Sequence, residues 1–242
     1  MKTESRNQAG LRSTYHSLKR AMHALRGKDI WQRAQMECER AWLGNAGACW
    51  CVCPQGLSAS SVVYSAGVGE DISFDLALIQ CFGVQVHAFD PTPQSIEWLQ
   101  NQRVPPEFVS HAYGVAGFDG RCAFLPPENP THVSHTIVKR ESSRPAIEVP
   151  VQRLGTLMKM LGHNHIDLLK MDIEGAEYGV LTDMLACRIP VKQMLVEFHH
   201  RWPRIGVEKT KQATRALNAA GYRIFNVSPS GEEYSFLMPL PE

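Results

Sequence analysis

The chain has 242 residues, of which 44% are hydrophobic and 20% charged, a composition typical of one globular α/β domain with a substantial core. Its formal net charge of +1 provides no field that would attract nucleic acid or an anionic membrane, so we expect no nucleic-acid partner. The amino-terminal segment is polar and basic, and no apolar run approaches the about 20 residues that a membrane helix needs. We therefore expect a cytoplasmic protein without a membrane span.

The amino-terminal part of the chain differs in pattern from the rest. Residues 1–45 contain many helix formers, with apolar side chains three and four positions apart. This spacing predicts a helical extension over residues 1–50, ahead of a main domain over residues 51–242. The segment CWCVC at 49–53 alternates, and we interpret its cysteines as small buried hydrophobic side chains, since the chain has no paired C-x-x-C motifs.

Strand and helix patterns alternate from residue 61 onward. Apolar and alternating runs predict strands over residues 61–66, 84–90, 107–116, 165–172, 191–198, 222–228 and 233–240. Helical spacing predicts helices over residues 71–83, 92–100, 153–161, 174–185 and 207–221. The alternation predicts an α/β fold with a mostly parallel sheet covered by helices on both faces, and the final two strands predict an antiparallel hairpin at one edge.

Residues 116–150 interrupt this alternation. They are rich in proline, glycine, serine and asparagine and contain short alternating runs. We interpret them as an insertion with extended segments or a hairpin over the edge of the main sheet, placed to form a lid over an acceptor.

The segment VVYSAGVGEDISFD at 62–75 follows the first strand of the main domain with two glycines and two acids. Gly67 and Gly69 let the backbone turn tightly and approach a ligand closely, and Asp90 ends the next strand, where α/β folds place the acid that binds ribose. A dinucleotide fingerprint would need a third glycine where Ile72 stands, and carboxylates beside the loop would repel a pyrophosphate. The loop acids suit a cationic ligand such as S-adenosylmethionine.

A second candidate site follows the buried strand at 165–172. The segment IDLLKMDIEGAE brings Lys170, Asp172, Glu174 and Glu177 to the strand end and the following turn. Asp172 is expected to point into the same crevice as the glycine loop, because the two strands are neighbours in such a sheet. Glu177 has a simpler explanation, since an acid at a helix amino terminus caps free N–H groups.

Together, VVYSAGVGEDISFD, VHAFDPTP, LLKMDIEGAEYGVL and VEFHHRW resemble the FkbM-type methyltransferases, over roughly residues 50–240. The resemblance implies the Rossmann-like class I methyltransferase fold with seven strands, S-adenosylmethionine as methyl donor, and a hydroxyl acceptor that is often a sugar or secondary metabolite. It also implies roles for individual residues. The implied cofactor-binding residues are Ser65, Gly67, Gly69, Asp71 and Ser73 at the methionine end, Asp90 and Pro91 at the ribose, and Tyr113, Gly114 and Val115 beside the adenine. Lys170, Asp172 and Glu174 would face the transferred methyl group.

Methyl transfer to a hydroxyl needs help with the proton of the acceptor, and two designs fit the sequence. In the first, His199 or His200 accepts the proton. In the second, Asp172, Glu197 and His199 bind a divalent cation such as Mg²⁺ that chelates the acceptor. Glu197 also has a structural interpretation, as a buried acid paired with Lys170.

We therefore expect an S-adenosylmethionine-dependent O-methyltransferase for a small hydroxylated acceptor, plausibly a sugar, glycoside or secondary metabolite, with Asp172, Lys170 and His199 as its catalytic residues. The alternatives are an NAD-dependent oxidoreductase and a noncatalytic binding protein with a degenerate cofactor pocket. A homo-oligomer is compatible with the sequence.

Overall fold

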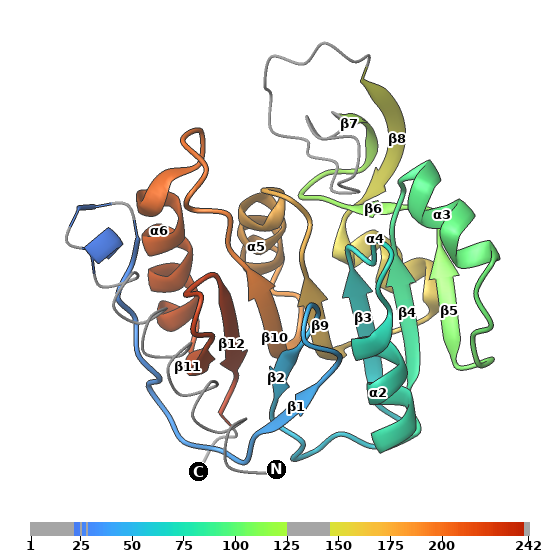
Figure 1. Ribbon diagram of the computed structural model, residues 1–242, viewed down its shortest axis with the longest axis horizontal. Helices are drawn as coiled ribbons and strands as arrows, with labels where there is room; N and C mark the ends of the chain where they lie inside the picture. Colours follow the sequence, from blue (N-terminus) through green and yellow to red (C-terminus); the bar gives the residue numbers. More distant parts are fainter. Residues whose placement is uncertain (1–21, 25, 28, 125–145, 240–242) are drawn as a thin grey trace, which may run out of the picture.

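The computed structural model describes residues 22–24, 26–27, 29–124 and 146–239. Its centre is a seven-stranded sheet whose strands lie in the order β11-β12-β10-β9-β3-β4-β5 (Figure 1). The strands are β3 (Val62–Ala66), β4 (Gln85–Phe89), β5 (Phe108–His111), β9 (Ile166–Met171), β10 (Val191–Glu197), β11 (Arg223–Val227) and β12 (Glu233–Leu237).

All strands of this sheet run parallel except β12. It pairs antiparallel with both β10 and β11, and the β11–β12 hairpin forms one edge. The central strands are buried on both faces, and β9 is buried at each of its six positions. Such continuous burial explains why the segment IDLLKM is almost uninterruptedly apolar. The predicted α/β fold with a mostly parallel sheet and an antiparallel edge hairpin is confirmed.

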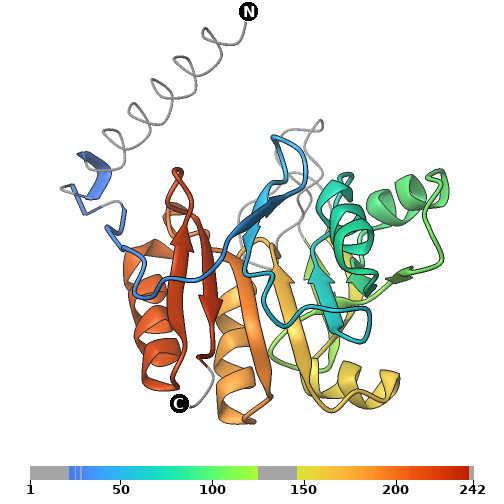
Figure 2. The same cartoon turned by 90° about the horizontal axis from the view of Figure 1, so that it is seen from below.

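Five helices cover the two faces of the sheet (Figure 2). Helices α2 and α3 lie on one face, and α4, α5 and α6 lie on the other. Their bounds are α2 (Ser73–Phe82), α3 (Pro93–Gln100), α4 (Leu154–Leu161), α5 (Glu177–Ala186) and α6 (Gly206–Ala219). Each βα connection along the parallel strands brings a loop to the same edge of the sheet, the edge where open α/β folds bind their ligands.

A short hairpin precedes the main sheet and packs on the α2 face (Figures 1 and 2). Its strands are β1 (Ala41–Leu43) and β2 (Trp50–Val52). The domain boundary predicted at residue 50 therefore falls inside this hairpin. The predicted amino-terminal helix lies mostly outside the described residues, and residues 30–40 contain no helix. Cys51 and Cys53 are buried as expected, whereas Cys49 is exposed, because β2 begins one residue after it.

A second, three-stranded sheet lies beyond the carboxyl ends of the central strands (Figure 1). Its order is β6-β8-β7, with β6 (Gly114–Val115), β7 (Gly120–Phe124) and β8 (Ile147–Gln152). The antiparallel pair β7–β8 agrees with the hairpin predicted in the 116–150 insertion. The centre of that insertion, residues 125–145, lies outside the described residues, so its role as a lid stays a prediction.

None of the helices in the described ranges combines the length and the apolar character that a bilayer crossing demands.

Candidate functional site

A cavity of about 370 Å³ lies at the carboxyl ends of β3, β4 and β9. Six segments form its walls: the turn of the β1–β2 hairpin, the loop after β3, the loop between β4 and α3 with the start of α3, the small sheet, the end of β9 with the loop that follows it, and the ends of β10 and β12. The lining residues are Gly47, Ala48, Cys49, Trp50, Gly67, Val68, Gly69, Glu70, Asp71, Phe89, Asp90, Pro91, Thr92, Ser95, Gly114, Val115, Ala116, Phe124, Val151, Lys170, Asp172, Ile173, Glu174, Ala176, Glu197 and Glu233. Seven of these side chains are carboxylic acids, and among the described lining residues only Lys170 is cationic.

Gly67 is the point at which the loops after β3 and β9 touch. Its φ of 79° lies in the left-handed region, and a Cβ built on it would lie 1.6 Å from the carbonyl oxygen of Asp172. The backbone N–H of Gly67 donates to the carbonyl of Phe89 (3.0 Å), and Lys170 Nζ donates to the carbonyl of Gly67. Only glycine fits here, because any side chain would separate the two loops.

Asp90 holds the glycine loop in place. Its Oδ2 accepts from the backbone N–H of Val68 (3.1 Å) and of Gly69 (2.9 Å). Its Oδ1 accepts from the backbone N–H (2.9 Å) and the hydroxyl (2.6 Å) of Thr92. Asp90 thus connects the β3 loop to the start of α3 and lies in the wall of the cavity.

Asp71 is fixed by a network that reaches the β1–β2 hairpin. Its Oδ1 accepts from the backbone N–H of Ser73 (2.9 Å), and its Oδ2 accepts from Asn45 Nδ2 (2.7 Å). These hydrogen bonds and the nearby charge of Lys170 outweigh desolvation and lower the pKa of Asp71. Asp71 therefore presents a carboxylate to the cavity at neutral pH.

Lys170 lies among acids and against an aromatic ring. It is largely buried, with Nζ 5.4 Å from the centre of the Trp50 ring. Its charge lowers the pKa of Asp75 and Asp172, although burial outweighs this effect and raises both pKa values. The ammonium group therefore offsets part of the negative charge on this side of the cavity.

Three carboxyl groups surround His199, at the end of β10. Its Nε2 lies 3.3 Å from Glu174 Oε2 and 3.8 Å from Asp172 Oδ1, and its Nδ1 lies 3.1 Å from Glu177 Oε1. Burial would lower the pKa of His199, but Glu174 and Glu177 outweigh burial and raise it to about 12. His199 is therefore an imidazolium that offsets part of the negative charge of its carboxylate neighbours.

The backbone after β9 explains how Glu174 reaches this cluster. Glu174 has a φ of 54°, a left-handed conformation that is uncommon for a residue with a side chain, and Gly175 follows with a φ of 98°. Glu177 Oε1 accepts from the backbone N–H of Ile173 (2.9 Å) and Gly175 (3.3 Å), as well as facing His199. The capping role expected of Glu177 is thus directed at the loop before α5.

Two further acids lie in the cavity wall at the β10–β12 side. Glu197 and Glu233 lie directly opposite each other on these antiparallel strands. Burial and the neighbouring charges of Asp172 and Glu233 raise the pKa of Glu197 to about 9. Burial, with a smaller contribution from Glu174, also raises the pKa of Asp172. Glu197 is therefore protonated at neutral pH.

The structure gathers most of the predicted site residues around one cavity. Of the predicted cofactor residues, Gly67, Gly69, Asp71, Asp90, Pro91, Gly114 and Val115 line the cavity. Ser65, Ser73 and Tyr113 do not. Ser65 is fully buried in β3, and the hydroxyl of Ser73 accepts from the backbone N–H of Asn45 (2.9 Å).

The predicted catalytic residues fall into two groups. Lys170 and Asp172 line the cavity, and about a third of the Asp172 side chain (32%) is exposed. His199 lies behind Asp172 and Glu174 and does not line the cavity. His200 is fully buried and its Nε2 lies 3.0 Å from Asp29 Oδ1, so it does not reach the cavity. Neither histidine therefore lies at the cavity surface, where the first design requires it.

The cation site of the second design also differs from its expected composition. Ligand atoms of Asp172, Glu174 and His199 lie within 4.8 Å of one another, so Glu174 takes the place predicted for Glu197. The ion pairs of the His199 imidazolium with Glu174 and Glu177 are a second explanation of why these groups lie together. A role for Mg²⁺ stays a prediction.

The sequence analysis did not predict one wall of the cavity, and for a second wall it predicted the segment at 116–150 but not the residues that line the cavity. The first is the hairpin turn at residues 47–50, and the second is Ala116, Phe124 and Val151 of the small sheet. The first wall precedes the strand–helix alternation that drew attention to the site. The second depends on which face of short strands turns inward, which the local pattern of apolar residues does not specify.

Comparison with known protein families identifies the domain. The profile of the Methyltransferase FkbM domain matches residues 62–224. The protein named "Probable methyltransferase-like protein 24" from Rattus norvegicus is 27% identical over 175 residues, which cover 68% of this chain and 42% of the relative. The protein of the same name from Homo sapiens is 28% identical over 144 residues, or 58% of this chain and 33% of the relative. The chain thus spans less than half the length of these curated relatives.

Two solved structures show weaker similarity. The Methyltransferase FkbM from Methylobacillus flagellatus aligns with 75% of this chain and 44% of its own, at 14% identity and a TM-score of 0.47. Fibrillarin from Aeropyrum pernix, solved with natively bound S-adenosyl-L-methionine, aligns with 87% of this chain and 85% of its own, at 10% identity and a TM-score of 0.41. The match of the domain profile to residues 62–224 is decisive: the chain belongs to the FkbM methyltransferase domain family.

Proposed function

We propose that the protein is an S-adenosylmethionine-dependent O-methyltransferase that acts on a hydroxyl group of a small acceptor, such as a sugar, glycoside or secondary metabolite. One observation carries this proposal: the cavity beside the glycine loop has seven lining carboxyl groups and one lining ammonium group among the described residues. Such a lining favours a cationic sulfonium and an ammonium group, and it disfavours the pyrophosphate of a dinucleotide.

The cofactor subsites follow from the order of the lining residues. Gly67, Gly69 and Asp71 would hold the methionine end, where the ionised Asp71 attracts the ammonium group. Asp90 and Pro91 would form the ribose subsite, with Asp90 keeping the loop amides in position. Gly114 and Val115 would lie beside the adenine.

Asp172 is the best-placed group to receive the acceptor's proton. It is partly exposed in the cavity, and its raised pKa makes it a stronger base than an ordinary carboxylate. S-adenosylmethionine supplies an already activated methyl group when bound. With the donor bound, Asp172 would accept the hydroxyl proton while the acceptor oxygen bonds to the methyl carbon, the carbon–sulfur bond breaks and the sulfur leaves as a neutral thioether.

His199 then acts through its neighbours. Its imidazolium pairs with Glu174 and Glu177 and lies 3.8 Å from Asp172, so it would orient the Asp172 carboxylate and keep it ionised. Lys170, which donates a hydrogen bond to the carbonyl of Gly67, would fix the distance between the glycine loop and β9. Both are positioning residues in this proposal.

A screen of hydroxylated small molecules with isotope-labelled methyl donor tests the proposal. We expect a labelled product whose mass increases by one methyl group, formed at least about a hundredfold more slowly by the Asp172→Asn variant. Donor binding without any methylated product across sugars, glycosides and phenols would contradict the acceptor class, and product on an amine alone would replace O-methylation by N-methylation. A cytoplasmic location and self-association stay predictions that fractionation and light scattering can test.

A further inference from the structure

The turn of the β1–β2 hairpin forms one wall of the cavity although it precedes the matched family domain. Gly47, Ala48, Cys49 and Trp50 line the cavity, whereas the family profile begins at residue 62. The hairpin is therefore a part of the site that the family match does not cover.

The base of this hairpin is hydrogen-bonded to side chains of β10 and β12 in the central sheet. The hydroxyl of Ser235 on β12 donates to the carbonyl of Cys51 (2.8 Å). The amide of Gln193 on β10 accepts from the backbone N–H of Cys53 (2.7 Å) and donates to its carbonyl (3.1 Å). These buried hydrogen bonds fix the direction in which the turn projects.

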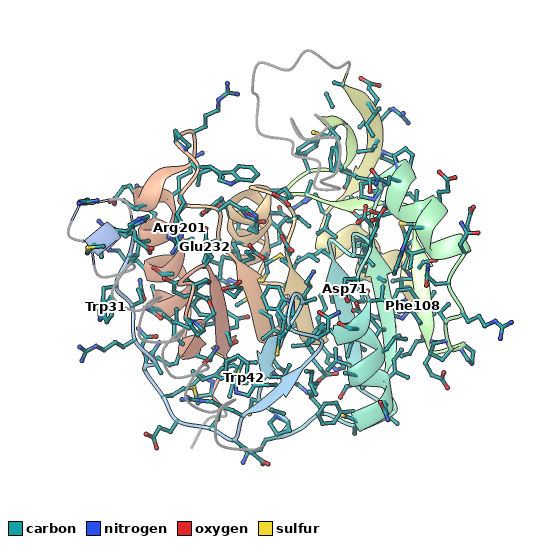
Figure 3. All side chains as sticks on the ribbon, in the orientation of Figure 1. Trp31, Trp42, Asp71, Phe108, Arg201 and Glu232 are labelled. Carbon is teal, nitrogen blue, oxygen red and sulfur yellow. The ribbon has the colours of Figure 1, made fainter. Side chains whose placement is uncertain are left out.

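The tip of the hairpin is attached to the glycine loop through one side chain. Asn45 Oδ1 accepts from the backbone N–H of Gly47 (2.9 Å) and Ala48 (3.1 Å), which closes the turn. Its Nδ2 donates to Asp71 Oδ2 (2.7 Å), and its backbone N–H donates to the hydroxyl of Ser73 (2.9 Å). Figure 3 shows Asp71 beside the hairpin tip.

Gly44 makes this tight turn sterically possible. It has a φ of 100°, and a Cβ built on it would lie 2.1 Å from the carbonyl oxygen of Ala48. The turn from Gly44 to Cys49 is therefore a compact wall whose position depends on Asn45 and on the hairpin base.

We propose that the turn Gly44–Cys49 covers the amino-acid end of the methyl donor and that Asn45 is its positioning residue. Asn45 holds the Asp71 carboxylate toward the donor's ammonium group while it closes the turn above it. This inference rests on the proposed function, and it adds a binding wall outside the matched domain.

Calorimetric titration with S-adenosylhomocysteine tests the role of Asn45. We expect Asn45→Ala to weaken binding about five- to tenfold, the size expected for the loss of one typical intramolecular hydrogen bond. Asn45→Asp keeps an oxygen that can close the turn but places a carboxylate against Asp71. We therefore expect it to bind S-adenosylhomocysteine at least as weakly as Asn45→Ala does. Trp42→Ala, on the exposed outer side of the same hairpin, serves as the matched control and should bind like the wild type.

Alkylation of cysteines with N-ethylmaleimide, read by mass spectrometry, tests the wall itself. Cys49, Cys81 and Cys187 are all exposed, but only Cys49 lines the cavity. We expect S-adenosylhomocysteine to slow the labelling of Cys49 at least fivefold and to leave Cys81 and Cys187 unchanged.

The outcomes separate the two proposals. A wild-type protein that does not bind S-adenosylhomocysteine contradicts the proposed function. A wild-type protein that binds it, with unchanged Cys49 labelling and wild-type affinity in both Asn45 variants, contradicts only this inference. Wild-type affinity in Asn45→Asp with loss in Asn45→Ala would reduce Asn45 to a structural turn residue and would also overturn it.

Discussion

At the scale of single residues, the charge balance around Asp172 determines the chemistry of the cavity. Asp172 and Glu197 are acids with raised pKa values, while His199 is a base with a raised pKa. The positive charge of His199 therefore lies behind the cavity wall, whereas the carboxyl groups of Asp172 and Glu197 line the cavity. A histidine held in this way donates hydrogen bonds and does not accept a proton.

Asp172→Asn tests this assignment. Loss of a general base lowers the rate about 10²- to 10⁴-fold, and we expect a loss in this range with S-adenosylhomocysteine affinity within about threefold of the wild type. The thermal midpoint should not fall, because burial, with a smaller contribution from Glu174, disfavours the charged carboxyl group that the change removes. Full turnover by this variant would exclude Asp172 as the base.

Glu197→Gln distinguishes a protonated acid from a cation ligand. The pKa of Glu197 is raised to about 9 in the folded protein, so its ionisation opposes folding increasingly as the pH rises from about 4.5 toward 9. We expect the Gln variant to gain up to about 4 kcal/mol in the free energy of unfolding at pH 7.5, measured with urea, and to gain nothing below pH 4.

The same variant and chelation test the predicted cation. Since Gln reproduces the protonated acid, the account expects turnover to survive both the substitution and exhaustive treatment with EDTA. Loss of turnover in both experiments, restored by added Mg²⁺, would instead support a cation that chelates the acceptor.

Gly67→Ala tests the contact between the two loops. The new Cβ would overlap the carbonyl of Asp172, so we expect a loss of more than about 3 kcal/mol in the free energy of unfolding. Gly162→Ala is the control, because Gly162 has a similar φ of 73° and no atom within 4 Å of its Cβ position. The control isolates backbone strain and should cost about 1 kcal/mol. Equal losses in urea denaturation would show that backbone strain, and not the loop contact, explains the glycine.

At the scale of elements, a buried ion-pair network joins the amino-terminal segment to the loop after β10. Asp29 Oδ1 lies 3.0 Å from His200 Nε2, and Asp29 Oδ2 lies 2.6 Å from Arg201, whose other nitrogen lies 2.5 Å from Glu232. Figure 3 shows Arg201 and Glu232 side by side. His200 therefore stabilises the loop that carries His199 and is not part of the cavity.

Asp29→Asn tests this connection through its pH dependence. Hydrogen bonds from His200 and Arg201 outweigh burial and lower the pKa of Asp29 to about 2. An acid with a lowered pKa stabilises the fold above its unfolded value near 3.8, and this contribution is lost as the pH falls toward 2. We expect the variant to lose about 2–3 kcal/mol at pH 7 and much less at pH 2.5, measured by urea denaturation.

The exposed pair of Glu208 with Lys211 provides the control for Asp29. Glu208→Gln should change the unfolding free energy by less than about 0.5 kcal/mol, because both partners are largely exposed. If Asp29→Asn and Glu208→Gln lowered the free energy of unfolding equally at pH 7, the network around Asp29 would stabilise the fold no more than an exposed ion pair does.

Elements with a periodic pattern could be predicted from the sequence, and the loops between them only in part. The helix after β3 ends where Gly83 adopts a left-handed conformation with a φ of 66°, as its position predicted. Thr92 precedes Pro93 at the start of α3, but its hydroxyl is hydrogen-bonded to Asp90 and Ser95 and does not cap the helix. The direction of Glu174 could not be predicted, because it depends on a left-handed backbone at a residue that rarely adopts one.

At the scale of the whole molecule, the fold brings three distant stretches of sequence to one cavity. The parallel sheet places the ends of β3, β4 and β9 side by side, which the alternation of strands and helices predicted. The hairpin at residues 41–52 and the small sheet complete the enclosure. Their placement depends on long-range hydrogen bonds, such as that between Ser235 and Cys51, for which no local pattern exists.

Direct titration of the purified protein with S-adenosylhomocysteine, beside a parallel titration with NADH, tests the central claim that this acidic cavity accepts a sulfonium donor and rejects a dinucleotide. We expect one S-adenosylhomocysteine bound per chain and no heat from NADH, with Gly67→Ala abolishing the binding. Saturable binding of NADH, or the absence of S-adenosylhomocysteine binding by a folded wild-type protein, would contradict it.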